Sequence, residues 1–349
     1  MPPKLHPQRQ QHQHQHQQPP PLADTLRLCA SCAYKGLRDA FSWPKTLITI
    51  YASKTIQSAT LRCIILNGVI FLGSMLFFER LVMPTLHFVF GVSNSQGYDE
   101  AAPFFFKAVY SAFRLFYNIF WVYPIYAASF ILNSIWYQQI ADRAYQMQQA
   151  SNTSNPSRGT ISPAAPPPSF LARLPDEIYR ALFFANYLVL ISVVYSIPVV
   201  GPGVSLLFFT WITAYYCFEY VGGCMGGRMT LYTWISRGWK LEQRLEYFEE
   251  HWAYFAGFGL PLALITFFLS TLVGAGVFAI FFPCYIIMAT LALPYPRSGS
   301  SRQQFHRFIP YRLSIFYPVR KMNAMAIAVM RILGGGRIGG SVGAVRARG

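Results

Sequence analysis

The chain has 349 residues, of which 53% are apolar, 17% aromatic and only 12% charged. Soluble domains carry roughly 25% charged residues, so this composition argues against a water-soluble enzyme or binding domain. The net charge of +16 does not indicate nucleic acid as a partner. The basic residues lie between and beyond the apolar segments, where they suit the anionic surface of a lipid bilayer.

The N-terminal region divides into a tail and an amphipathic segment. Residues 1–23 contain the tract QHQHQHQQPPP and are too polar to form a packed core, so we expect a disordered tail there. Residues 24–60 are expected to contain a helix that Asp24 caps and that lies in the membrane interface. Its basic residues are Arg27, Lys35 and Arg38, and its apolar side consists of Leu26, Ala30, Ala33, Leu37 and Phe41.

Residues 61–147 form the first expected membrane half. An uncharged run begins at Cys63, and a second one covers 27 residues at 115–141. The second run exceeds the roughly 20 residues that cross a bilayer. The loop between the two runs, residues 93–103, contains two acidic residues but no Lys or Arg, whereas every other connection is basic. The positive-inside rule therefore predicts that both chain termini are cytosolic and that this loop faces the opposite side.

Residues 176–293 form the second expected membrane half. Two runs here contain no charged residue, 38 residues at 181–218 and 45 residues at 252–296, and each is about twice the length of one crossing. Breaks rich in Pro and Gly at 198–203 and 274–276 predict that each run is a hairpin of two helices. These hairpins either cross the membrane fully or are re-entrant. The expected fold class is an all-α, multi-pass integral membrane protein.

Three regions outside the apolar runs are expected to face the cytosol: a Ser/Pro-rich linker at 148–175, a loop at 219–251 and a basic tail at 294–349. The loop contains the string KLEQRLEYFEEHW, whose composition predicts a helix. This helix is either a solvated amphipathic helix or a docking helix for a soluble protein partner. In the second alternative its apolar anchors are Trp239, Leu241, Leu245 and Phe248.

Polar side chains at membrane depth are costly, so several are candidates for a structural role or for a solute path. The amides of Asn67, Asn133 and Asn186 favour hydrogen bonds between helices. Gln138 and Asp142 lie four residues apart and share a helix face. They are expected to form a helix cap, an interhelical contact or a wall of a solute path.

Glu219 ends the third apolar block, and its carboxylate is expected to pair with a basic residue of the following loop. Arg228 and Arg244 are the two candidates, and a proton or ion site is the alternative.

The sequence contains no pattern typical of catalysis or cofactor binding. Cys29 and Cys32 form one CxxC without a second pair or a nearby His cluster, so a zinc ion would lack half of its ligands. There is no phosphate loop, dinucleotide fingerprint, nucleophile elbow or His-Glu-x-x-His string. We therefore expect no cofactor, no metal and no enzymatic activity.

Four blocks of sequence point to a known family. They are LNG at 66–68 with LFF at 76–78, WVYP at 121–124 with NSIWYQQIADRAY at 133–145, CFEY at 217–220, and QRLEYFEEHW at 243–252 followed by FAGFGLPLALIT at 255–266. In this order they resemble the etoposide-induced protein 2.4 family over roughly residues 60–290. The string GLRDAF at 36–41 is also similar to the N-terminal helix of that family.

The resemblance implies a non-enzymatic, multi-pass protein of the endoplasmic reticulum membrane that acts in autophagy and, in animals, in growth suppression and apoptosis. The wider superfamily includes bacterial sulfate permeases of the CysZ type, which use half-penetrating helix pairs in oligomers. It therefore implies a sulfate-type anion permease as the alternative function and a homo-oligomer as a candidate assembly. A protein that shapes membrane curvature is a third hypothesis. Residues 221–240 and both ends of the chain depart from the family pattern, so no family contact is carried over to them.

Overall fold

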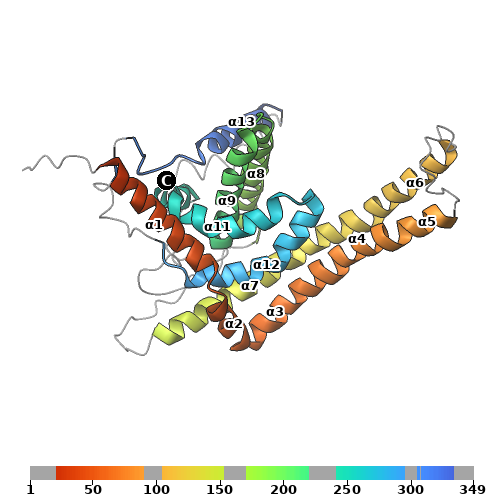
Figure 1. Cartoon of the computed structure of the whole chain (residues 1–349), viewed down its shortest axis with the longest axis horizontal. Helices are drawn as coiled ribbons and strands as arrows, with labels where there is room; N and C mark the ends of the chain where they lie inside the picture. The colour runs from red at the N-terminus through yellow and green to blue at the C-terminus, as the bar shows by residue number, and fades with distance from the viewer. Residues whose placement is uncertain are drawn as a thin grey trace, which may run out of the picture.

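The computed structural model describes residues 21–89, 104–152, 170–219, 241–294, 305–306 and 308–333. All regular elements in these ranges are helices, which agrees with the predicted all-α class. Two long helical runs extend together to the right in Figure 1, and the other helices gather at the left. We call these two parts the arm and the body.

The arm consists of two helical runs that lie side by side (Figure 1). The first run is α3 (Lys54–Ile64), η1 (Ile65–Gly73), α4 (Ser74–Phe77), η2 (Phe78–Val82) and α5 (Met83–Val89), and the second is α6 (Phe104–Tyr117), η3 (Asn118–Val122) and α7 (Tyr123–Asn152). The three η segments are π-helical. The first run begins at Lys54, earlier than the apolar run at Cys63, because Ile56 and Ala59 are already buried where α3 packs on α7.

Within the described residues, three helical stretches are long and apolar enough to cross a membrane: 54–86, 111–148 and 271–291. The first contains 33 residues. At 1.5 Å per residue it measures about 50 Å, compared with about 30 Å for the hydrocarbon core of a bilayer. The arm is therefore long enough to cross a membrane and to extend beyond it.

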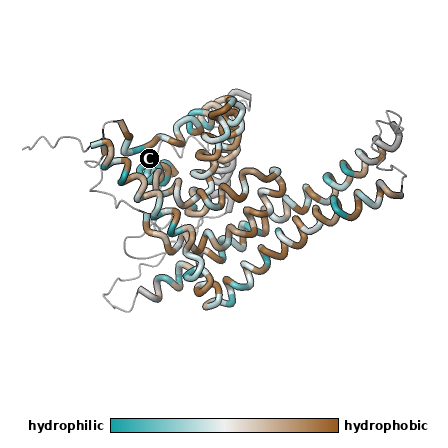
Figure 2. The backbone as a smooth tube through the Cα atoms, viewed as in Figure 1, coloured by the Kyte–Doolittle hydropathy of each residue, from teal (hydrophilic) through white to brown (hydrophobic). Residues whose placement is uncertain are grey.

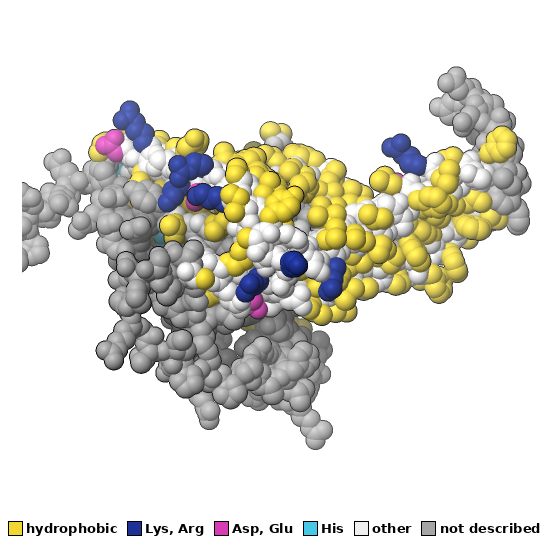
Figure 3. All heavy atoms as spheres, turned by 90° about the horizontal axis from the view of Figure 1, so that it is seen from below, with side chains coloured by type: hydrophobic (Ala, Val, Ile, Leu, Met, Phe, Trp, Pro, Cys, Tyr) yellow, Lys and Arg dark blue, Asp and Glu magenta, His cyan; other side chains and the backbone are white. Residues whose placement is uncertain are grey.

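The outer surface of the arm is apolar. The side chains of Val69, Phe120 and Phe130 are 65%, 65% and 68% exposed. Figure 2 shows a mainly hydrophobic arm with some hydrophilic residues in its outer part, and Figure 3 shows hydrophobic side chains covering one of its faces. Soluble monomers rarely expose a continuous apolar surface of this extent, so lipid is the solvent that suits the arm.

The first predicted hairpin is formed by α8 (Phe170–Tyr195) and α9 (Gly201–Glu219). Its turn covers residues 196–200 and overlaps the predicted break, and Val199 has a φ of 67° within it. Two hydrogen bonds join the helices: Tyr187 Oη donates to the carbonyl of Phe208 over 3.1 Å, and Ser205 Oγ donates to the carbonyl of Ile191 over 3.0 Å.

The second hairpin is formed by α11 (Trp252–Phe267) and α12 (Thr271–Leu291). The prediction that it breaks at residues 274–276 is wrong, because the turn covers residues 268–270 and both glycines lie inside α12. A Cβ atom at Gly276 would lie 2.7 Å from a side-chain carbon of Leu72 on the arm. Gly276 therefore allows α12 to approach the arm closely and does not break the helix.

The body is centred on α11, which packs against both α9 and α1 (Leu22–Ala40). A Cβ atom at Gly36 of α1 would clash with the backbone of Tyr254, and one at Gly257 would clash with the backbone of Ala33. These two glycines allow α1 and α11 to cross in direct backbone contact. The predicted cap by Asp24 is wrong, because α1 begins earlier, at Leu22, and makes no side-chain cap.

The remaining described helices are α2 (Trp43–Tyr51), α10 (Leu241–Glu250) and α13 (Tyr317–Leu333). α13 packs against α8, where Asn186 Nδ2 donates to Asn323 Oδ1 over 3.1 Å. Phe316, directly before α13, is fully buried and lies in ring contact with Phe248 of α10. A segment of the expected basic tail is therefore helical and contributes to the core.

Candidate functional site

A cavity of about 480 Å³ lies between the outer part of the arm and the turn before α12. Its apolar walls include Phe78, and its polar groups include Glu79 of η2, Arg114 of α6 and Asn118 of η3. Ser270 and Thr271, at the start of α12, close it on the side of the body. The cavity thus combines an acid, a base and the N-terminus of a helix near an apolar surface.

Two of the three π-helical segments supply residues to this cavity, since Glu79 lies in η2 and Asn118 lies in η3. π-helical turns are rare and are frequently found at functional sites. Tyr117 stacks on Phe78 with ring centroids 3.6 Å apart. The Tyr117 hydroxyl is buried and has no hydrogen-bond partner within the described part of the chain.

The six candidate residues from the sequence do not line this cavity. Asn67 of η1 and Asn133 of α7 face each other instead, with Nδ2-to-Oδ1 distances of 2.9 and 3.0 Å in the two directions. Asn67 Nδ2 also donates to the carbonyl of Cys63 over 2.8 Å. Both side chains are buried, so the pair joins the two runs of the arm by polar bonds within an apolar contact. A role of this pair in a solute path stays a prediction.

Gln138 and Asp142 contact each other along α7, where Gln138 Nε2 donates to Asp142 Oδ1 over 2.9 Å. Glu219 is the last residue of α9, and Arg244 is buried on α10. Arg228 lies outside the described residues. The predicted pairing of Glu219 with a basic residue of the loop, and the alternative ion site, therefore stay predictions.

The expected docking anchors on the loop at 219–251 are partly corrected by the structure. Leu245 and Phe248 are buried, and Phe248 stacks on Phe255 with ring centroids 3.9 Å apart. These two side chains contribute to the protein's own core, so they are not free to anchor a partner. Leu241 is half-buried, and Trp239 lies outside the described residues.

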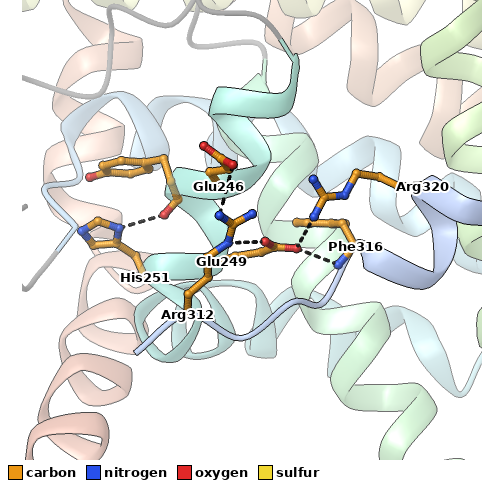
Figure 4. Close-up of polar contacts among 7 residues, drawn as sticks. Glu246, Glu249, His251, Arg312, Phe316 and Arg320 are labelled. Carbon is orange, nitrogen blue, oxygen red and sulfur yellow. Dashed lines mark hydrogen bonds and ion pairs between the residues drawn. The ribbon is translucent and has the colours of Figure 1, made fainter. Parts of the chain in front are cut away.

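Sequence reasoning missed an ionic cluster around Glu249, which Figure 4 shows between α10 and the C-terminal segment. The Glu249 side chain is fully buried. Its Oε2 accepts from Arg312 Nε over 2.8 Å, its Oε1 accepts from the backbone N–H of Phe316 over 3.1 Å, and Arg320 lies 3.6 Å from Oε1. Arg312 also binds Glu246 over 3.1 Å. A buried Glu opposite a basic segment is a pairing signal, but the string alone did not indicate which carboxylate faces inward.

The electrostatics of this cluster favour the ion pair. Burial by itself lowers the pKa of Arg312, but its hydrogen bond with Glu249 and the two negative charges of Glu249 and Glu246 raise that pKa above its ordinary value. The guanidinium therefore stays charged at physiological pH. The cluster fixes residues 312–320 to α10, and it contains no group arranged as a nucleophile.

No group of three or more potential metal ligands occurs within the residues that the structure describes. Cys29 and Cys32 are both free thiols on α1. The structure thus offers no set of ligands on which a metal-dependent mechanism could be built from the described residues.

An all-helical chain with several candidate spans and an exposed apolar arm defines a helical membrane protein. The family model for "Sulfate transporter CysZ/Etoposide-induced protein 2.4", EI24, matches residues 42–283, so the chain belongs to the EI24 family. This result confirms the resemblance seen in the sequence. No solved structure gives a significant match.

Three relatives illustrate the family. A protein named "Protein EI24 homolog" from Arabidopsis thaliana is 31% identical over 314 residues, covering 85% of this chain and 94% of its own length. A protein with the same name from Dictyostelium discoideum is 31% identical over 283 residues, covering 81% of this chain and 79% of its own length. "Ectopic P granules protein 4" from Caenorhabditis elegans is 28% identical over 171 residues, covering 48% of this chain and 46% of its own length.

Proposed function

We propose that this protein is a non-enzymatic, multi-pass protein of the endoplasmic reticulum membrane that acts in autophagy. The exposed apolar surface of the arm is the observation that carries the membrane assignment, because lipid is the solvent in which Val69, Phe120 and Phe130 can remain exposed. Membership of the EI24 family supports the organelle and the process. A cytosolic protein partner would bind the loop at 219–251 through residues other than Leu245 and Phe248.

We further propose that the base of the arm faces the cytosol. Lys54 begins the first run there, and Arg143 of the second run lies close by, with its Nε 3.4 Å from Ser53 Oγ. Basic residues favour the cytosolic side of a membrane. Both chain termini would then be cytosolic, and the outer end of the arm would face the lumen.

The turn of the α8–α9 hairpin supports a re-entrant arrangement. Ile197, Val199 and Val200 are 53%, 96% and 63% exposed, although exposed turns in water are usually polar. The backbone N–H groups of Ile197, Val200 and Gly201 all donate to carbonyls within the turn. This turn therefore exposes apolar side chains and few unpaired peptide groups, which suits a position inside the bilayer.

The proposal is tested by complementation in cells that lack their own EI24-family protein. Expression of this chain should restore autophagic flux, and the tagged protein should co-localise with an endoplasmic reticulum marker. A variant with Phe120→Lys and Phe130→Lys places two charges on the lipid-facing arm and should fail to insert. Stable, reticulum-localised protein without any recovery of flux would rule out the autophagy role.

A sulfate-type anion conduit is the second candidate, favoured by the description of the family model and by the charged cavity beside α12. It ranks second because Asn67 and Asn133 use their amide groups on each other. Uptake of radioactive sulfate into liposomes that contain the purified protein decides between the two candidates. A saturable flux would reverse their order.

A further inference from the structure

We propose that the cavity between the arm and the start of α12 binds the headgroup of a zwitterionic phospholipid, with the phosphate at Arg114 and Tyr117 and the ammonium at Glu79. This inference depends on the membrane embedding proposed above. It is independent of the role in autophagy.

The depth of the cavity matches the level of lipid headgroups. Glu79 follows Lys54 by 25 residues (79 minus 54) on one continuous helical run. At 1.5 Å per residue this separation is about 37 Å, slightly more than the hydrocarbon thickness of about 30 Å. If Lys54 lies at one surface of the bilayer, Glu79 lies at the opposite surface. α12 ends at the same level, because Gly276 contacts Leu72 of η1 and Thr271 lines the cavity with Glu79.

The charges of the cavity match the two charges of such a headgroup. Glu79 and Arg114 are both exposed, and neither forms an ion pair with another described residue. Arginine binds phosphate through charge-assisted hydrogen bonds, and a carboxylate binds an ammonium group. An oxyanion alone would satisfy Arg114 and leave the carboxylate of Glu79 beside a second negative charge.

The orphaned hydroxyl of Tyr117 is the strongest pointer to a ligand. Its oxygen is buried at the cavity wall and has no partner in the described chain. A buried polar group without a hydrogen bond is costly and calls for an acceptor or donor from outside the protein. A phosphate oxygen in the cavity would accept this hydrogen bond.

The remaining walls suit the glycerol and acyl parts of a lipid. Met75, Phe78 and Met83 give the cavity an apolar side that is continuous with the lipid-facing arm. Methionine and aromatic side chains adapt to flexible apolar ligands. A free anion would gain nothing from this side of the cavity, whereas a phospholipid contacts both sides.

The test is native mass spectrometry of the purified full-length protein, titrated with dioleoyl phosphatidylethanolamine, with dioleoyl phosphatidylglycerol and with inorganic phosphate. We expect a saturable phosphatidylethanolamine adduct that excess inorganic phosphate does not displace. Phosphatidylglycerol, which lacks the ammonium group, should bind about tenfold more weakly, since one hydrogen bond to a charged group is lost.

Three substitutions locate the adduct. Tyr117→Phe keeps the ring stack on Phe78 and removes only the hydroxyl, and it should weaken the adduct about tenfold, as should Arg114→Gln. Arg114→Lys should retain most of the binding because it retains the charge. Arg62→Gln removes an exposed basic residue at the other end of the same arm and should change nothing.

Unchanged binding in both Tyr117→Phe and Arg114→Gln would overturn the proposal. Equal displacement by inorganic phosphate would assign the cavity to a free oxyanion and would also overturn it. Recovery of the protein in the soluble fraction would instead refute the membrane embedding, and this result is distinguishable because it is obtained before any lipid is added.

Discussion

Arg312 Nε lies 2.8 Å from Glu249 Oε2, and this ion pair joins a loop helix to a segment 63 residues further along the chain. Glu249 is fully buried, whereas the Arg312 side chain is 34% exposed. The carboxylate is thus the inner partner, and it also accepts the backbone N–H of Phe316. The pair holds the segment before α13 in place, so that Phe316 can enter the aromatic core beside Tyr187, Tyr215 and Phe248.

Glu249→Ala should lower the free energy of unfolding by about 2–4 kcal/mol, because it leaves the buried N–H of Phe316 without an acceptor and Arg312 without its inner partner. Glu249→Gln retains an acceptor and should cost less. The thermal midpoint of the detergent-solubilised protein, followed by size-exclusion chromatography after heating, measures the effect. Glu242→Gln, an exposed carboxylate on the same helix, is the matched control. Equal midpoints for Glu249→Ala and Glu242→Gln would refute the structural role of the cluster.

Asn67 and Asn133 should show strong coupling in a double-mutant cycle. Each single change to Leu leaves a buried amide without its partner and should cost about 1–2 kcal/mol. The double change to Leu should cost clearly less than the sum, because no unpaired amide remains. The cycle is measured by the same thermal assay. Additive losses would show that the two amides do not depend on each other.

The α1–α11 crossing should tolerate no added methyl group. Gly257→Ala places a Cβ atom against the backbone of Ala33 and should destabilise the fold by about 1–3 kcal/mol. Gly203 is the matched control, because a Cβ atom there meets nothing within 4 Å. Gly203→Ala should be neutral or should stabilise α9 by up to about 1 kcal/mol, since alanine is the better helix former. Similar midpoints for the two variants would contradict the close crossing.

Cys32 should be unreactive at neutral pH. Burial and then the neighbouring Cys29 raise the pKa of the Cys32 thiol from 9.0 to about 11. At pH 7.5 its thiolate fraction is then about 100-fold lower than that of an unperturbed thiol, and alkylation should slow accordingly. Because the raised pKa belongs to the folded state, the folded protein holds this proton more tightly, and the associated stability is lost as the pH rises from about 9 towards 11. Iodoacetamide labelling mapped by mass spectrometry tests this, and rapid labelling of Cys32 at pH 7.5 would refute its burial.

The sequence predicted those features that composition and periodicity determine. The helical class and the α8–α9 turn follow from uncharged runs and from Pro198, and both agree with the structure. The second turn was misplaced because Gly276 looks like a helix breaker in the sequence, whereas its function is to admit Leu72 of the arm. Only the packing of α12 on η1 distinguishes these two uses of a glycine.

The polar clusters could be predicted only in part. Asn67 and Asn133 stood out because amides are rare in apolar runs, and they are in contact. Glu249 and Arg312 did not stand out, since both lie in polar strings where charged residues are ordinary. The cavity was also missed, because Glu79 and Arg114 are separated in sequence and are brought together with Thr271 by the tertiary fold.

The most direct test of the account is a depth measurement at Val199 and Phe130 in the reconstituted protein. Each residue is replaced in turn by a spin-labelled cysteine in a background without the native cysteines, and the label's exposure to oxygen and to a water-soluble nickel chelate is compared. A label at Glu242, which is exposed on α10, is the aqueous reference. Labels at Val199 and Phe130 should be accessible to oxygen and shielded from the chelate, because both side chains face hydrocarbon. Chelate accessibility equal to that at Glu242 would contradict the claim that the arm and the hairpin turn lie within the membrane.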